Sequence, residues 1–158
     1  MQTGDIDGVV RIARIAFPDH FEDRACFAER HALYPEGCFV LACAAGDVRG
    51  YLIAYPWLWG SAPKLNSLIG ALPDHPDVLY LHDLALHPDL QGRGHAMAIV
   101  EQLARQVRAE GWTAIALVAV NRAGPFWERL GFAAAADDAI AQTLASYGAE
   151  ADYRVRRL

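Results

Sequence analysis

One segment constrains the fold of this chain more than any other, because a strand, a glycine-rich turn and a long helix follow one another directly. Residues 78–86 form an apolar run typical of a strand, which Pro88 ends. The turn is Gln91-Gly92-Arg93-Gly94-His95-Ala96. Apolar residues then recur at helical spacing from Gly92 to Glu110, and Gly111 closes that helix. This order predicts a sheet covered by helices, with the turn at a helix N-terminus.

The glycine-rich turn has the features of an anion site. The first turn of a helix exposes unpaired N–H groups and the positive end of the helix dipole. Glycines let a phosphate approach that backbone closely, and Arg93 adds a formal charge. A P-loop does not fit, because no Lys-Ser or Lys-Thr follows, and the dinucleotide fingerprint has its third small residue later than Ala96. We predict a pyrophosphate cradle; the alternative is a turn that only starts a helix.

The remaining periodicities predict a mixed α/β domain. A loop that is rich in Pro, Gly and Ser runs from Pro56 to Pro76, and loops of that length in compact domains are usually functional or disordered. No linker is visible, so we expect residues 1–158 to form a single domain. Helices are expected over 6–17, 21–33, 124–130 and 138–145, and strands over 38–45, 49–57, 113–120, 132–135 and 151–156.

Composition excludes several classes of protein. The net charge of −5 disfavours a nucleic-acid-binding module and mildly favours cationic small molecules. No apolar run is long enough to span a membrane, and no signal peptide is visible, so we expect a cytoplasmic protein without membrane contact. The three cysteines, Cys26, Cys38 and Cys43, show no C-x-x-C spacing, so we expect neither disulfides nor a bound metal.

Two motifs of the chain resemble those of the GNAT N-acetyltransferase superfamily. Leu84-Ala85-Leu86-x-Pro88, followed by Gln91-x-x-Gly94-x-Ala96, resembles its acyl-CoA signature, Q/R-x-x-G-x-G/A. Asn121 and the segment 126–132, which reads FWERLGF, resemble the superfamily's last motif. Order and spacing agree over residues 78–132, and the helices and hairpin upstream match as well.

The resemblance implies a seven-stranded mixed sheet, flanked by about four helices and splayed in a V between its fourth and fifth strands. Acetyl-CoA would lie in the split as co-substrate, with its pantetheine amides paired to the backbone of the preceding strand. Only Met1 to Gly4 precede the first helix, so we expect the first strand to be short or missing. The implied cofactor-binding residues are Leu84, Ala85, Leu86, Gln91, Gly92, Arg93, Gly94, His95, Ala96, Asn121, Phe126 and Trp127.

His82 is the first candidate for the base that deprotonates the acceptor amine. The stretch LHDLALH at residues 81–87 resembles the arylalkylamine N-acetyltransferases, whose strand reads L-H-x-L-A-V-H and whose first histidine acts as base through water. A histidine that is only structural is the alternative. Strand alternation places Tyr80 on the face of His82 and Asp83 on the opposite face. Asp83 would bind the substrate ammonium or orient a neighbour.

The proton for the departing thiolate has no obvious source. Many members of the superfamily carry a tyrosine where this chain has Trp127, and the indole N–H is not a usable acid. Tyr147 is a substitute candidate; another group could serve, or the thiolate could leave unassisted. The acceptor pocket should come from the opening helices and the long loop. The expected substrate contacts are Phe17, Trp57, Tyr80 and Asp83.

These features predict an acetyl-CoA-dependent N-acetyltransferase that acts on a small amine by direct attack in a ternary complex. Three alternatives remain open. One is a non-catalytic domain that binds or senses acyl-CoA, another is an acetyltransferase acting on a protein N-terminus or lysine, and the third is a nucleotide-binding domain of another fold. The resemblance also leaves a homodimer open.

Overall fold

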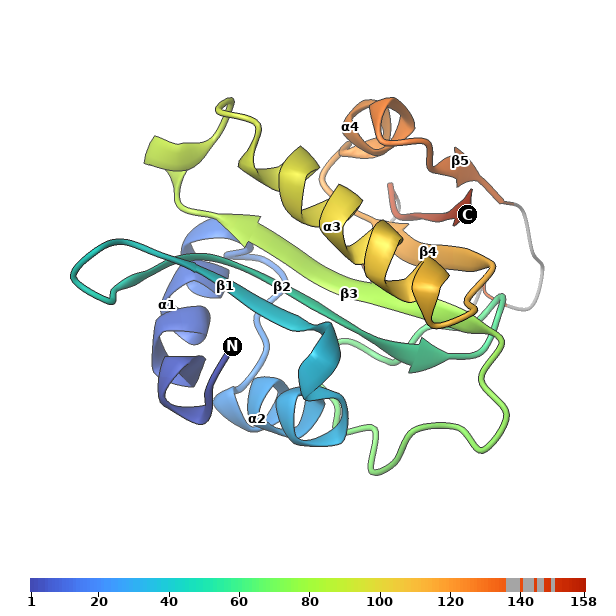
Figure 1. Ribbon diagram of the computed structural model, residues 1–158, viewed down its shortest axis with the longest axis horizontal. Helices are drawn as coiled ribbons and strands as arrows, with labels where there is room; N and C mark the ends of the chain where they lie inside the picture. The colour runs from blue at the N-terminus through green and yellow to red at the C-terminus, as the bar shows by residue number, and fades with distance from the viewer. Residues whose placement is uncertain (136–139, 141–143, 145–146, 149) are drawn as a thin grey trace.

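The computed structural model describes residues 1–135, 140, 144, 147–148 and 150–158. Its centre is a six-stranded sheet in the order β1-β2-β3-β4-β6-β5, with helices on both faces (Figure 1). The strands are β1 (Cys38–Ala42), β2 (Val48–Trp57), β3 (Val78–Leu86), β4 (Ala114–Ala119), β5 (Ala133–Ala134) and β6 (Asp152–Arg157). The helices are α1 (Ile6–Ala16), α2 (Arg24–Leu33), α3 (His95–Ala109) and α4 (Gly124–Arg129). The expected mixed α/β architecture is confirmed.

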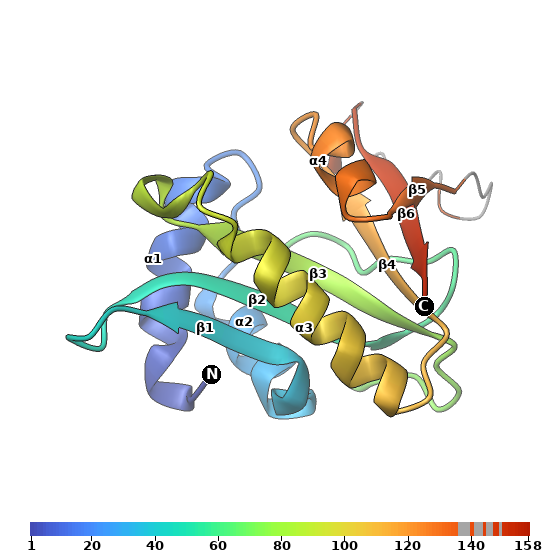
Figure 2. The ribbon, with the colours of Figure 1, turned by 45° about the horizontal axis from the view of Figure 1, so that its top comes forward.

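The sheet opens between β3 and β4. These parallel strands pair only at Leu79↔Ile115 and Tyr80↔Ala116 and then diverge, as Figure 2 shows. Among the described residues, the short 3-10 turn Thr3–Asp5 stands before α1 in the place of the first strand of the expected pattern. When that strand is counted, β3 and β4 are the fourth and fifth, and the V-shaped split lies where it was expected.

Two apolar cores cover the two faces of the sheet. One core joins α1 and α2 to β2 and β3 through residues such as Ile6, Phe27 and Tyr80. The other joins α3 and α4 to the opposite face through residues such as Val100 and Trp127. Because helices cover both faces of the sheet, a ligand can reach its centre only at the strand edges that are open in the split.

A β-bulge at His82 breaks the alternation of β3. The β2–β3 register passes from Ala54↔Leu81 to Ile53↔Asp83, so His82 has no partner across the strands. Leu81 packs in the core under α3 and α4 (the α3–α4 core), and Ala85 packs in the core under α1 and α2 (the α1–α2 core). Strict alternation would put both residues on one face. The expectation that Asp83 opposes His82 is therefore wrong. Tyr55 and Tyr80 lie beside the His82 ring, and the Tyr51 hydroxyl of the same core bonds Asp83.

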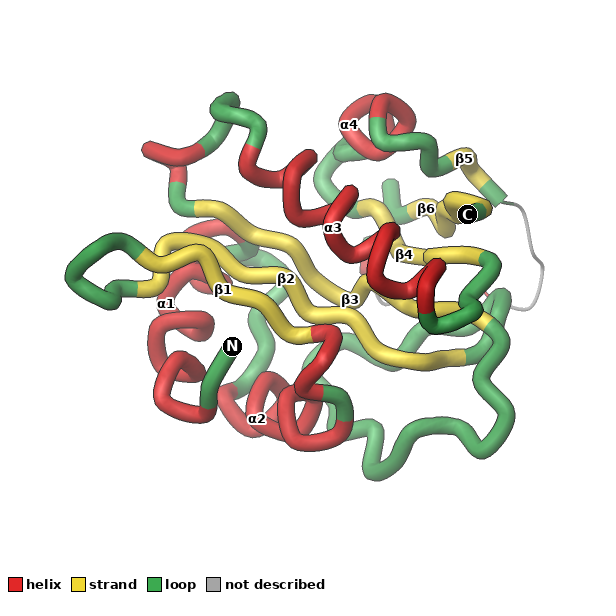
Figure 3. Tube along the Cα trace, viewed as in Figure 1, coloured by secondary structure: helices red, strands yellow, loops and turns green. Residues whose placement is uncertain are grey.

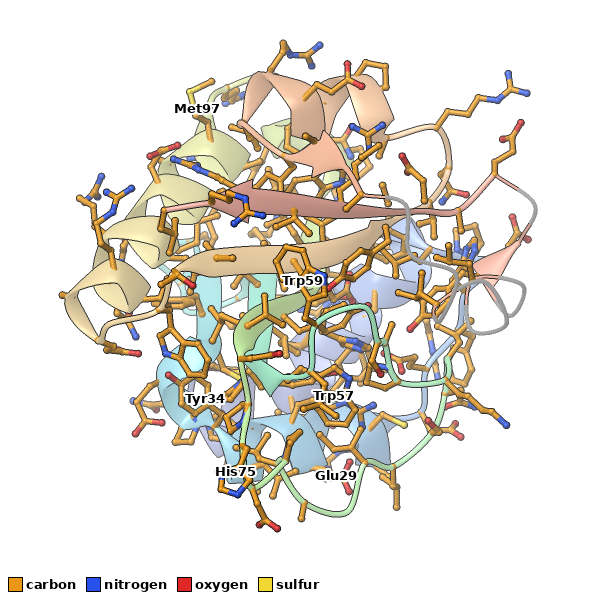
Figure 4. The ribbon with its side chains drawn as sticks, turned by 90° about the vertical axis from the view of Figure 1, so that its right-hand side faces the viewer. Glu29, Tyr34, Trp57, Trp59, His75 and Met97 are labelled. Atoms are coloured by element: carbon orange, nitrogen blue, oxygen red, sulfur yellow. The ribbon has the colours of Figure 1, made fainter. Side chains whose placement is uncertain are left out.

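The long loop, residues 58–77, is tied to α2 along its middle (green in Figure 3). The buried Arg30 donates from Nη2 to the Ser67 carbonyl at 2.7 Å. The N–H groups of Ile69 and Gly70 donate to the Glu29 carboxylate at 2.8 and 2.9 Å. Figure 4 shows Glu29 next to the loop. These bonds give the loop a defined course across the α1–α2 side.

The helix expected over 138–145 lies largely outside the described residues. None of the helices that are described combines the length and the apolar character needed to cross a membrane.

Candidate functional site

A cavity of about 640 Å³ passes through the split sheet. Its walls include Ala85 and Val118 from the α1–α2 core, and Leu117 and Trp127 from the α3–α4 core. The opening is therefore continuous from one face of the sheet to the other. We call the part near α3 and α4 the donor half, after the acetyl donor that is expected there. We call the part near α1 and the α1–α2 loop the acceptor half, after the expected acceptor amine.

The glycine-rich turn borders the donor half and presents free backbone donors. Gly92 and Gly94 have φ of 71° and 82°, a left-handed conformation that glycine adopts readily. The Gln91 N–H bonds to Pro88 and the Ala98 N–H to Gly94. In the described part of the chain, the backbone N–H groups from Gly92 to Met97 have no acceptor. A Cβ at either glycine would meet no protein atom within 4 Å, so the space above the turn is open to a phosphate.

Nine of the twelve residues predicted to bind the cofactor line the cavity: Leu84, Ala85, Leu86, Gln91, Gly92, Ala96, Asn121, Phe126 and Trp127. Arg93, Gly94 and His95 are not part of this lining; Gly94 is the N-cap of α3 and His95 is its first residue. Beyond Tyr80 the edge of β3 that faces β4 has no ladder partner among the described residues. This edge can pair with an extended amide chain, as expected for pantetheine.

The most polar part of the acceptor half is a pair between Glu22 and His82. Glu22 Oε2 lies 2.7 Å from His82 Nε2, and the two side chains are only 5% and 4% exposed. His82 Nδ1 is buried and has no hydrogen-bond partner among the described residues. If Nε2 carries the proton toward the carboxylate, Nδ1 keeps a lone pair for an incoming group.

Glu22 is held by more than the histidine. The Asn66 N–H donates to Glu22 Oε1 at 3.1 Å, and Arg30 Nη2 lies 4.0 Å from the same oxygen. Burial acts to raise the pKa of Glu22, but the charge of His82, its hydrogen bond and the charge of Arg30 outweigh burial and lower it. Glu22 is therefore a carboxylate at neutral pH, facing the imidazole.

Asp83 also faces the acceptor half. Burial raises the pKa of Asp83 to about 6, although the His82 charge and a hydrogen bond from the Tyr51 hydroxyl oppose the rise. The bulge in β3 and the α1–α2 loop together place two carboxyl groups and one imidazole on the same side of the split. This cluster suits a cationic ligand and a proton transfer.

The other predicted catalytic residue, Tyr147, forms part of the acceptor wall. Its hydroxyl donates to the Pro63 carbonyl at 2.6 Å, and burial raises its pKa to about 12. Its own carbonyl oxygen lies 3.0 Å from Nε2 of His20, which comes from the α1–α2 loop. The phenol proton is therefore already engaged on the wall.

The predicted substrate contacts divide into two groups. Phe17 and Asp83 line the cavity. Tyr80 does not line it and is only 1% exposed, packed in the core beside His82 and Tyr147. Trp57 lies outside the lining too, with its ring against Tyr55 at 5.9 Å, near the long loop in Figure 4. The structure thus brings two of the four predicted contacts to the acceptor half.

Trp127 lines the cavity. Its ring makes edge contacts with Phe126 and Phe132, with centroids 5.0 and 5.2 Å apart. Aromatic packing around Trp127 therefore shapes the donor half.

Among the described residues, no group of three or more His, Cys, Asp or Glu side chains could hold a metal ion.

Sequence reasoning missed two acceptor-side residues, Glu22 and His20. Both lie in the α1–α2 loop, where no motif or periodicity distinguishes them. The long loop that carries Asn66 was expected to be functional, and Asn66 does contact Glu22.

Comparisons with known proteins agree with this geometry. The chain shares 16% identity with Ard1 from Thermoplasma volcanium (TM-score 0.74; 100% of this chain and 94% of that one covered). It shares 11% with the loading GNATL domain of CurA from Lyngbya majuscula (TM-score 0.81; 99% and 94%). It shares 16% with the GphF GNAT-like decarboxylase, solved with isobutyryl-CoA (TM-score 0.73; 99% and 96%).

These similarities concern the fold, and no curated protein matches the chain. The model of the acetyltransferase (GNAT) family, in contrast, matches residues 6–132, which include the split sheet, the glycine-rich turn and the FWERLGF segment. The chain belongs to the acetyltransferase (GNAT) family.

Proposed function

We propose that this protein transfers an acetyl group from acetyl-CoA to the amine of a small molecule, by direct attack in a ternary complex. The observation that carries the proposal is the cavity, which connects the open turn on the donor side with the Glu22–His82 pair on the acceptor side. A thioester held in the donor half and an amine held in the acceptor half would meet inside the split.

On the donor side, the N–H groups from Gly92 to Met97 would hold the pyrophosphate, and the open edge of β3 would hold the pantetheine arm. GphF, a protein of the same fold, was solved with an acyl-CoA, which supports this assignment. Acetyl-CoA supplies an activated acyl group, and every other contribution comes from the side chains of this chain. Trp127 would pack against the arm and exclude water from the thioester.

On the acceptor side, Asp83 would bind the ammonium and His82 would take its proton. Glu22 accepts from Nε2 of His82, so the unpartnered Nδ1 would be the basic atom. The carboxylate of Glu22 would stabilise the imidazolium that forms, as an orienting acid does beside a catalytic histidine. The neutral amine could then attack the thioester carbonyl.

The thiolate would leave without a proton from Tyr147. That phenol donates to Pro63, and burial raises its pKa to about 12. A free thiol has a pKa of about 8.5, so the phenol is the weaker acid of the two. We therefore assign Tyr147 to the wall of the site, and the thiolate leaves unassisted.

Other functions fit the site less well. An anionic substrate, such as a decarboxylase would take, meets Glu22 and Asp83 in the acceptor half. A domain that only binds acyl-CoA does not require a buried histidine paired with a carboxylate.

The proposal is tested in two steps. Thermal unfolding is measured with acetyl-CoA, CoA, ATP and NAD; a ligand at about 100 times its Kd should add about 2.7 kcal/mol and raise Tm by several degrees. We expect this rise with acetyl-CoA and CoA only. An amine panel is then scored by CoA release and by mass detection of the N-acetyl product. No shift with millimolar CoA species, or no product with any amine, would contradict the proposal.

A further inference from the structure

We infer that the acceptor is a compact amine with an apolar body and no carboxylate group. This inference rests on the proposed function and specifies its substrate. It comes from three independent features of the acceptor half: the charges that face it, the apolar surface around them, and the contacts that join the segments of its wall.

The charges facing the acceptor half are acidic or titratable, and none is a fixed cation. The ionisable lining residues are His20, Glu22, His82, Asp83 and Tyr147, and the described lining contains no Lys or Arg. The ten residues outside the described part of the chain include no Lys or Arg either. An ammonium is therefore attracted here, whereas a carboxylate on the same molecule meets Glu22 and Asp83 without a cation to pair with.

Arg30, the cation near this cluster, is already engaged. Its guanidinium lies 2.8 Å from Glu29 Oε2 and 2.7 Å from the Ser67 carbonyl, and its side chain is 1% exposed. It does not line the cavity. Arg30 balances the charge of Glu22 from outside the cavity and offers no site for a substrate carboxylate.

The surface around the polar cluster is apolar. The lining there includes Ala16, Phe17, Leu65, Val118 and Val120. A substrate body that is aromatic or aliphatic would bury against these side chains, and each buried methylene contributes about 0.8 kcal/mol. A hydrophilic polyamine would lose water without gaining such contacts. The wall thus favours one ammonium on an apolar body.

Contacts between three distant segments join part of the wall of the acceptor half. His20 of the α1–α2 loop bonds the Tyr147 carbonyl at 3.0 Å, and the Tyr147 hydroxyl bonds Pro63 of the long loop at 2.6 Å. The side chains of His20 and Tyr147 line the cavity at this part of the wall. A polypeptide entering in extended form would have to part these segments, whereas a small amine would not.

Matched amines test this inference with acetyl-CoA and the full chain. The compounds are 2-phenylethylamine, phenylalanine and phenylalaninamide, which differ in the α-substituent: none, a carboxylate, or a neutral amide of similar size. Hexylamine and spermidine compare an apolar body with a hydrophilic polycation, and a tripeptide amide that begins with Phe tests whether the joined wall segments keep a polypeptide out. The readout is kcat/KM for N-acetyl product.

We expect 2-phenylethylamine and phenylalaninamide to exceed phenylalanine at least 100-fold, hexylamine to exceed spermidine, and the tripeptide amide to be at least 10-fold poorer than phenylalaninamide. Asp83→Asn should reduce the preference in kcat/KM for 2-phenylethylamine and phenylalaninamide over phenylalanine, because it removes one of the two carboxylates. Equal use of phenylalanine, or better use of spermidine or the tripeptide, would overturn the inference and leave acetyl transfer standing. Failure of every amine would overturn the proposed function and this inference with it.

Discussion

The Glu22 carboxylate lies 2.7 Å from His82 Nε2 and joins the α1–α2 loop to the bulged residue of β3, 60 positions further along the chain. Both side chains are almost fully buried, and the other ring nitrogen of His82 has no partner among the described residues. With Nε2 facing the carboxylate, Nδ1 is the ring nitrogen of His82 that is left without a partner.

Glu22→Gln is expected to lower kcat about 10- to 100-fold and to leave the Kd for acetyl-CoA unchanged. An amide cannot stabilise the imidazolium as a carboxylate does, and it allows the ring to change tautomer. Ring ¹⁵N shifts in NMR should show the proton on Nε2 of His82 in the parent protein and a mixture in the variant.

Glu29→Gln is the matched control for this change. Glu29 bonds the same Arg30 and the same long loop, but it does not contact His82. We expect kcat to stay within about threefold of the parent. An equal loss in both variants would assign the effect to loop packing, contrary to the positioning role of Glu22.

Gly94→Ala is expected to weaken acetyl-CoA binding at least 10-fold. The position has a φ of 82°, and an added Cβ would meet no protein atom, so the methyl group would enter the space above the free N–H groups. Gly46→Ala is the control: its φ is 89° in the β1–β2 turn, also with no atom within 4 Å. Both changes carry a similar backbone cost of about 1 kcal/mol. Calorimetric titration should separate them, and equal affinities would argue against the cradle.

Asp83→Asn is expected to change the pH dependence of stability. The carboxyl has a pKa of about 6 in the fold, above its ordinary value of 3.8, so its ionisation costs stability as pH rises from about 4 to above 6. The variant has no charge to bury and should gain about 1 to 3 kcal/mol over the parent at pH 8, with little gain at pH 4. Denaturant unfolding at the two pH values measures this difference. A gain that does not depend on pH would contradict the assignment.

The same titration should appear in substrate binding. Asp83 is ionised above pH 6 and protonated below it, so KM for an ammonium substrate should rise as pH falls through about 6 in the parent protein. In Asp83→Asn the KM should exceed the parent's value above pH 6, match it at lower pH, and lack this dependence. An unchanged KM in the variant would remove Asp83 from the acceptor site.

Tyr147→Phe tests the proposal that the thiolate leaves unassisted. The change removes the bond to the Pro63 carbonyl and should cost about 1 kcal/mol of stability. We expect kcat to fall less than about fivefold. A loss of more than 100-fold, with acetyl-CoA affinity retained, would instead identify Tyr147 as the acid.

The donor side of the site could be predicted from the sequence because its chemistry is local. The turn from Gln91 to Ala96 lies between a strand and a helix that are adjacent in the chain, and glycine spacing alone indicates where backbone N–H groups are exposed. The strand over 78–86 was predicted with the bounds that it has in the structure.

The acceptor side could not be predicted in the same way. Period-two alternation cannot reveal a bulge, so Asp83 was expected on the wrong face, and Tyr80 was expected at the substrate although it packs in the core. Glu22 and His20 reach the site only through the path of the α1–α2 loop around the sheet. Such contacts depend on tertiary packing and leave no local pattern in the sequence.

His82→Gln measures the central claim most directly. Turnover of 2-phenylethylamine is followed as CoA release together with mass detection of the product, and acetyl-CoA affinity is measured on the same samples. If His82 takes the amine proton, kcat should fall 100- to 10,000-fold with the Kd for acetyl-CoA unchanged. Retained turnover in a folded variant that binds acetyl-CoA would contradict the account.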